Sequence, residues 1–160
     1  AGWLLSFLTA LRVGIGGRDG IFALFSVLFI IKMSDAGAYF AGKQLGHRKL
    51  APELSPGKTI EGLIGGVLAA ILAAFVAFYL IRPGVVPAAL APSSLTILGY
   101  ATTITLIGVL GDLAESLIKR EMEVKDSSSW LPGLGGIMDT ADSVLLAAPV
   151  AYGWWMFGGF

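Results

Sequence analysis

The sequence predicts an all-α fold: a polytopic transmembrane helix bundle of about four full spans with a partial helix at the N-terminus. Hydrophobic residues make up 56% of the chain and charged residues 14%, and the mean hydropathy is +0.80. A water-soluble domain carries about 25% charged residues, and a core of this size cannot bury so much apolar surface. The apolar runs are about 20 residues long, enough for roughly 30 Å of hydrocarbon, where only helices satisfy the backbone. We expect residues 1–160 to form a single membrane-embedded domain.

The elements follow in order from these runs. Trp3–Val13 is apolar but too short to span, and we expect it to be the end of a helix that starts earlier in a longer protein. Gly62 and Gly66 have a GxxxG spacing that favours close helix packing, and Trp154 with Trp155 is typical of an interfacial anchor. The four spans are expected at Ile21–Gly42, Thr59–Ile81, Leu95–Lys119 and Ile137–Trp155, separated by polar loops at Lys43–Lys58, Arg82–Ser94 and Arg120–Gly136.

The distribution of basic residues predicts the orientation. Seven Lys and Arg lie in or beside the first and third loops, whereas Arg12, Arg18 and Arg82 are assigned to the other side. The positive-inside rule therefore predicts that the first and third loops are cytoplasmic. The formal net charge is zero, so nothing indicates a nucleic-acid partner.

Acidic residues inside the predicted spans are costly and are therefore candidates for function. They gather toward the predicted cytoplasmic side, which predicts a funnel-shaped polar cavity that opens to the cytoplasm. Two of them could instead have a purely structural role: Lys32 could neutralise Asp35, and the helix dipole favours Glu61 in the first turn of its helix. The residues are Asp35, Glu61, Asp112, Asp139 and Asp142.

Helical spacing groups several of these residues. Asp112, Glu115 and Lys119 share one helix face with Ser116 beside them, and Asp139 and Asp142 share another face. Carboxylates that gather without His or Cys suit a hard cation such as Mg²⁺. Neighbouring cations suit a substrate that carries phosphate.

Two loops could hold that phosphate. We expect Ser55–Thr59, which contains Lys58, to be a tight turn feeding a helix N-terminus, where anions bind. The later loop, together with the helix end before it, carries Lys119, Arg120, Lys125 and Asp126, followed by a Gly-rich turn with Gly135 and Gly136 that leads into the helix of Asp139. Carboxylates directly after an anion-binding turn predict a metal ion between them and the phosphate.

Several separated motifs closely resemble the signature of the phosphatidate cytidylyltransferases, over roughly residues 33–150. The match is carried by Ser34-Asp35-Ala36-Gly37-Ala38-Tyr39, Ser55-Pro56-Gly57-Lys58-Thr59-x-Glu61-Gly62, Gly111-Asp112-x2-Glu115-Ser116, Ile118-Lys119-Arg120-x4-Lys125-Asp126, and Leu134-Gly135-Gly136-Ile137-x-Asp139-x2-Asp142. The chain departs from the family pattern at Leu134, where the family has His, and at Thr140, where it has Arg.

The resemblance implies an integral enzyme, in a bacterial inner membrane with its site facing the cytoplasm, that makes CDP-diacylglycerol and pyrophosphate from CTP and phosphatidate. It implies that Asp112 and Asp139 bind Mg²⁺, with a second cation left open, and that Asp142 and Asp35 support the metal or orient substrate, with Glu115 a weaker candidate. Ser116 is expected to hydrogen-bond or pack, and the phosphates would be neutralised by Lys58, Lys119, Arg120 and Lys125.

Three alternatives remain open at this stage. One is another CTP-dependent membrane enzyme, such as a polyprenol kinase or an enzyme of the CDP-archaeol synthase type. Another is a transporter subunit whose buried acids relay ions. The third is a non-catalytic packing module. A homodimer is also left open.

Overall fold

The computed structural model describes residues 2–86, 92–121, 137–157 and 160, with the backbone alone at 137–142. Helix α1 (Gly2–Thr9) continues through a π-helical turn (Ala10–Gly14), and α2 spans Gly17–Leu45. Helix α3 (Ile60–Val76) continues through a second π-helical turn (Ala77–Ile81) into α4 (Arg82–Val85), and it is followed by α5 (Ser94–Glu121) and α6 (Ile137–Phe157). The chain is mostly helical, as predicted.

Among the described residues, three helical segments are long and apolar enough to cross a membrane: Gly17–Leu45, Ile60–Val85 and Ser94–Glu121. The first and third contain the predicted spans Ile21–Gly42 and Leu95–Lys119, and the second contains Thr59–Ile81 except for its first residue. Helix α3 exposes Ile64, Leu68 and Leu72 to 56, 63 and 66%, a stripe at helical spacing that suits lipid contact. In α6, the part with described side chains, Ser143–Phe157, is a shorter apolar helix. The membrane character is thus supported, and the expected count of four spans is not established.

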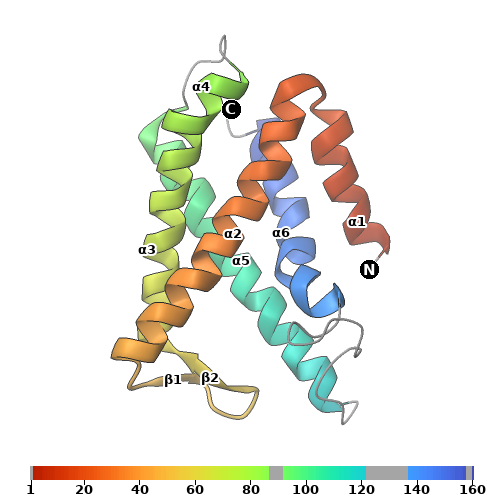
Figure 1. Ribbon diagram of the computed structural model, residues 1–160. Coiled ribbons are helices and arrows are strands. Elements are labelled where there is room, and N and C mark those ends of the chain that lie inside the picture. Colours follow the sequence, from red (N-terminus) through yellow and green to blue (C-terminus); the bar gives the residue numbers. More distant parts are fainter. Residues whose placement is uncertain (1, 87–91, 122–136, 158–159) are drawn as a thin grey trace.

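A short β-hairpin joins α2 to α3, where the sequence predicted an irregular polar loop. Strands β1 (Lys49–Ala51) and β2 (Ser55–Thr59) pair antiparallel, and residues 52–54 form the turn between them. The predicted tight turn at Ser55–Thr59 is therefore wrong, because this segment is extended and pairs with β1. Figure 1 shows the hairpin at one end of the bundle and α4 at the opposite end.

Small residues bring α2 and α3 together, and these two helices share the most extensive contact in the fold. A Cβ at Gly62 would lie 2.9 Å from the Ala38 carbonyl oxygen, and a Cβ at Gly66 would lie 3.0 Å from the carbonyl oxygen of Ser34. The predicted packing role of the GxxxG pair is confirmed. This close approach allows α2 and α3 to carry their polar ends into one site beside the hairpin.

The opposite half of the bundle has an aromatic core that surrounds a buried arginine, which forms an ion pair with a partly exposed aspartate. Phe22, Phe78 and Trp155 surround the Arg82 guanidinium, whose carbon lies 5.9, 5.8 and 5.6 Å from the three ring centroids. Arg82 is 3% exposed, and its Nη2 donates to Asp19 Oδ1 at 3.4 Å. Two predictions are wrong here: Arg82 does not begin a polar loop, because the helix continues past Ile81, and Trp155, 8% exposed, is a core residue.

Candidate active site

The hairpin end of the bundle contains a cavity of about 430 Å³. Four elements enclose it: α2, the hairpin, the first turn of α3, and α5. Its charged lining residues are Asp35 and Lys43 from α2, Lys58 from β2 and Asp112 from α5. The remaining lining is Ser34, Ala38, Tyr39, Gly42, Leu50, Gly57, Thr59, Gly62, Leu63 and Val109.

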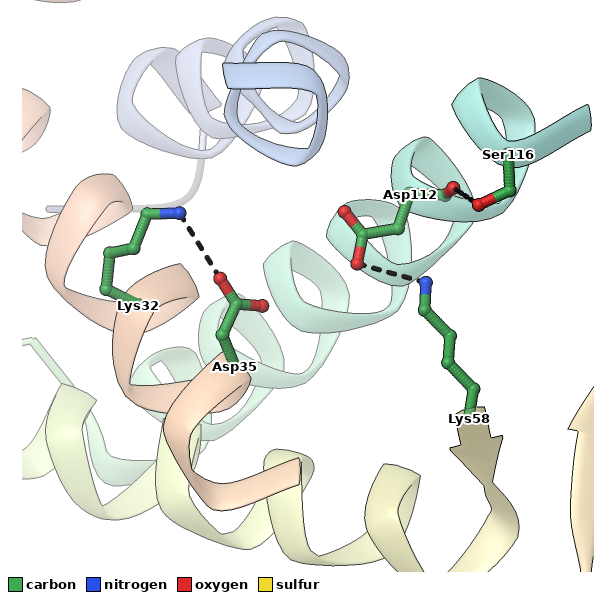
Figure 2. Close-up of polar contacts among 5 residues, drawn as sticks. All are labelled: Lys32, Asp35, Lys58, Asp112 and Ser116. Atoms are coloured by element: carbon green, nitrogen blue, oxygen red, sulfur yellow. Dashed lines mark hydrogen bonds and ion pairs between the residues drawn. The ribbon is translucent and has the colours of Figure 1, made fainter. Parts of the chain in front are cut away.

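Lys58 and Asp112 meet inside this cavity. Lys58 Nζ donates to Asp112 Oδ2 at 3.0 Å, although the two residues are 54 positions apart, and the other carboxylate oxygen is turned away from Lys58 (Figure 2). The side chains are 27% and 30% exposed, so the pair is largely shielded from solvent. The sequence predicted Lys58 as a cation that neutralises phosphate and Asp112 as a metal ligand, without predicting that the two side chains pair.

Local structure explains how Lys58 reaches this place. Thr59 ends β2 and caps α3, because its Oγ1 accepts from the Gly62 backbone N–H at 3.1 Å. The Ile60 N–H donates to the Arg48 carbonyl oxygen at 2.9 Å, which holds β2 against the start of β1. Lys58 is thereby fixed one residue before the helix cap and extends toward α5.

Asp35 reaches the same cavity from α2, and its role in orienting substrate stays a prediction. Its Oδ2 lies 3.3 Å from Lys32 Nζ, and about half of each side chain is exposed (Figure 2). The structural reading, in which Lys32 neutralises Asp35, therefore has direct support. The contact leaves Asp35 on the cavity wall, so both readings are compatible.

The last turns of α5 carry four more predicted residues, which do not line the cavity. Lys119 Nζ lies 3.3 Å from Glu115 Oε1 along one face of the helix. Ser116 Oγ donates to the Asp112 carbonyl oxygen at 2.8 Å, which agrees with a hydrogen-bonding role (Figure 2). Arg120 Nε donates at 2.8 Å to the carbonyl oxygen of Leu54, so it also ties the hairpin turn to α5.

Two residues that the sequence singled out near the hairpin lie outside the cavity lining. Ser55 lies on β2 and does not line the cavity. Glu61 does not line it either: its carboxylate accepts backbone N–H groups of His47 at 3.2 Å and Arg48 at 3.2 and 3.3 Å. Glu61 thus ties the end of α2 to the start of the hairpin.

Several predicted residues cannot be compared with the geometry. Lys125, Asp126, Gly135 and Gly136 lie outside the described residues. Asp139 and Asp142 are on the first turns of α6, and their side chains also lie outside the described part. Their roles stay predictions.

The oxygen donors of the cavity fit a hard cation. Within the described ranges, no three acidic or histidine side chains gather as a metal site by themselves. Asp35 and Asp112 nevertheless line one cavity beside Lys58. Mg²⁺ commonly takes one or two carboxylates and completes its shell with water and substrate phosphates. The residues present are therefore compatible with Mg²⁺ bound together with a polyphosphate.

Two cavity residues with large side chains that can contact a ligand were not among the predicted site residues. Tyr39 and Lys43 line the cavity from α2, and with Asp35 they lie on one face of that helix at intervals of four residues. This spacing from a predicted site residue was the signal that could have found them.

Comparisons with known proteins show the family of the chain. The model of the cytidylyltransferase family matches residues 2–157. A phosphatidate cytidylyltransferase of Haemophilus influenzae is 43% identical over 130 residues, covering 81% of this chain and 44% of the relative. Those of Bacillus subtilis and Pseudomonas aeruginosa are 42% and 44% identical, covering 83% and 79% of this chain and 47% and 45% of the relatives. The chain thus spans somewhat less than half the length of these relatives, and it belongs to the cytidylyltransferase family.

Proposed function

We propose that the protein transfers a cytidylyl group from CTP to phosphatidate and so forms CDP-diacylglycerol and pyrophosphate. The observation that carries the proposal is the cavity in which Lys58 and Asp112 meet, within a chain of the cytidylyltransferase family. A phosphate oxygen of the lipid bonds to the α-phosphorus of CTP. The bond from that phosphorus to the oxygen bridging to the β-phosphate breaks, and pyrophosphate leaves.

Nucleophile and electrophile are both anionic, so the main task of the protein is to offset charge and align the reactants. Lys58 supplies a cation inside the cavity, held in position by the hairpin and by Asp112. Asp112 and Asp139 would hold Mg²⁺, with Asp35 and Asp142 in support. The ion would supply charge neutralisation at the triphosphate. No covalent protein nucleophile is needed, because the lipid phosphate fills that role.

The membrane arrangement is part of the proposal. We place the hairpin end in the cytoplasm, where CTP is, and count α6 as a fourth span. Phosphatidate would enter from the adjacent leaflet with its acyl chains remaining in lipid. The described core of the far half, with Phe22, Phe78 and Tyr100 buried, supports a site open at one end better than a continuous ion path.

The test is pyrophosphate release by the purified full-length protein in mixed micelles. Release should require CTP, phosphatidate and Mg²⁺ together, and CDP-diacylglycerol should form in equal amount. A lipid kinase would release CDP instead. Formation of CDP, or pyrophosphate release that is indifferent to phosphatidate, contradicts the proposal.

A further inference from the structure

The rim of the cavity carries a lysine and a tyrosine from the last turns of α2. Lys43 Nζ lies 5.7 Å from the centroid of the Tyr39 ring. Both side chains line the cavity and are also exposed to solvent, so they lie at its opening. The ammonium group therefore has a cation–π contact with the ring, since cations favour an aromatic face.

Among the described charged side chains around the cavity, Lys43 is the one without an ion-pair partner. Lys58 is paired with Asp112, and Asp35 is paired with Lys32. In the described part of the chain, no carboxylate lies within ion-pair distance of Lys43. These five side chains therefore sum to one positive charge, and that charge is at the rim. An ammonium group in this position favours an anionic ligand such as a phosphate.

The position of Lys43 along α2 indicates which phosphate it meets. The helix ends at Leu45, so Lys43 lies in its last turn, whereas Asp35 is about 12 Å deeper along the axis at 1.5 Å per residue. Tyr39, Phe40 and Leu45 are 61, 60 and 62% exposed around it. Exposed aromatic and aliphatic side chains with a lysine at a helix end are typical of the membrane interface, where lipid phosphates lie.

We propose that Lys43 binds the phosphate of the lipid substrate at the rim of the cavity and that the Tyr39 ring orients its ammonium group. The proposal rests on the proposed function and adds a specific lipid-binding pair to it. The acyl chains would lie along the exposed apolar side of α2, and the phosphate would face the Lys58–Asp112 pair across the cavity.

The experiment measures KM for phosphatidate and KM for CTP separately, using the full-length protein in mixed micelles. Lys43→Gln should raise KM for phosphatidate about tenfold or more, as expected for the loss of a charged hydrogen bond. KM for CTP should change less than twofold, and Lys43→Arg should recover most of the loss. Lys49→Gln, at an exposed lysine of β1 that does not line the cavity, is the matched control and should change neither constant.

Tyr39 is tested as a positioning residue. Tyr39→Leu should raise KM for phosphatidate about threefold with little change in kcat, because the loss of a weak exposed cation–π contact is small. Tyr39→Phe keeps the ring and should recover most of that affinity. Failure of Phe to recover what Leu loses contradicts the role of the ring.

Two outcomes overturn the Lys43 proposal. An increase in KM for CTP in place of phosphatidate would assign Lys43 to a nucleotide phosphate, and unchanged constants would remove it from binding altogether. Native mass spectrometry with phosphatidate and with diacylglycerol gives a readout without turnover: Lys43→Gln should weaken only phosphatidate binding. An inactive wild-type protein that shows this selective loss would refute the proposed function and leave the Lys43 site standing.

Discussion

Replacing Lys58 by Met separates a catalytic role of the Lys58–Asp112 pair from a structural one. At 3.0 Å and an effective dielectric constant of about 20, the attraction between the two charges is about 5 kcal/mol. The side chains keep 27% and 30% exposure, so water screens part of this attraction and desolvation offsets more. We therefore expect the substitution to lower the free energy of unfolding by about 1–3 kcal/mol.

The expected loss of activity is much larger than this loss of stability implies. Removing a cation that offsets charge at the reacting phosphates should lower kcat about 10²- to 10³-fold, by analogy with the loss of one donor to a developing oxyanion. A domain with about 5 kcal/mol or more of stability stays mostly folded after a loss of about 2 kcal/mol. Unfolding therefore cannot account for a hundredfold decrease.

The assay is phosphatidate-dependent pyrophosphate release, paired with thermal unfolding in the same detergent. Asp112→Asn keeps an acceptor for Lys58 and should also lose activity, and the double variant should not regain it. Lys49→Met is the matched control in the same hairpin. Near-normal kcat in Lys58→Met together with a lower melting temperature would refute the catalytic reasoning and leave the pair a purely structural one.

Three further predictions concern packing, the hairpin and the metal. Gly65→Ala should destabilise the fold by about 1–3 kcal/mol in thermal unfolding, because its Cβ would overlap the Cβ of Ala41. The control Gly153→Ala has open space around the new Cβ and should not destabilise the fold. Equal stability of the two variants would contradict this packing. Arg120→Met removes the hydrogen bond to the Leu54 carbonyl and should speed proteolysis after Glu53 severalfold, whereas an unchanged rate argues against the tether. EDTA should abolish pyrophosphate release and added Mg²⁺ should restore it; activity that persists in EDTA refutes the metal requirement.

The sequence predicted the long helices well because the hydrocarbon layer imposes their length and polarity. The run Leu95–Lys119 lies within α5, and Thr59–Ile81 covers α3 and its π-helical turn. The hairpin was missed because its strands are only three and five residues long, and Pro56 and Gly57 are poor strand formers. Its pairing depends on the contacts of Glu61 and Arg120 with distant backbone, which no local pattern contains.

The sequence predicted how deep the candidate site residues lie in the membrane but not which of them form ion pairs. Hydropathy placed Asp35 and Asp112 near one membrane surface, and both line the cavity. Depth along a helix does not say which faces of two helices meet, so the contact of Lys58 with Asp112 required the fold. Arg82 shows the same limit at the far end, where a helix that continues past Ile81 turns an expected loop residue into a buried one.

The two ends of the bundle use buried charge in different ways. At the far end, three rings enclose the Arg82 guanidinium, and Asp19 is the acid that contacts it. Such an arrangement fastens α2 to the end of α3. At the hairpin end the charges border a cavity of about 430 Å³, and Lys58 and Asp112 belong to separate elements. If a substrate phosphate drew Lys58 away from Asp112, Lys58 would then pair with the phosphate. A metal ion bound at Asp112 would take the place of the lysine, so both side chains would keep a partner of opposite charge. The hairpin end therefore has the arrangement expected of a site that exchanges partners during a reaction.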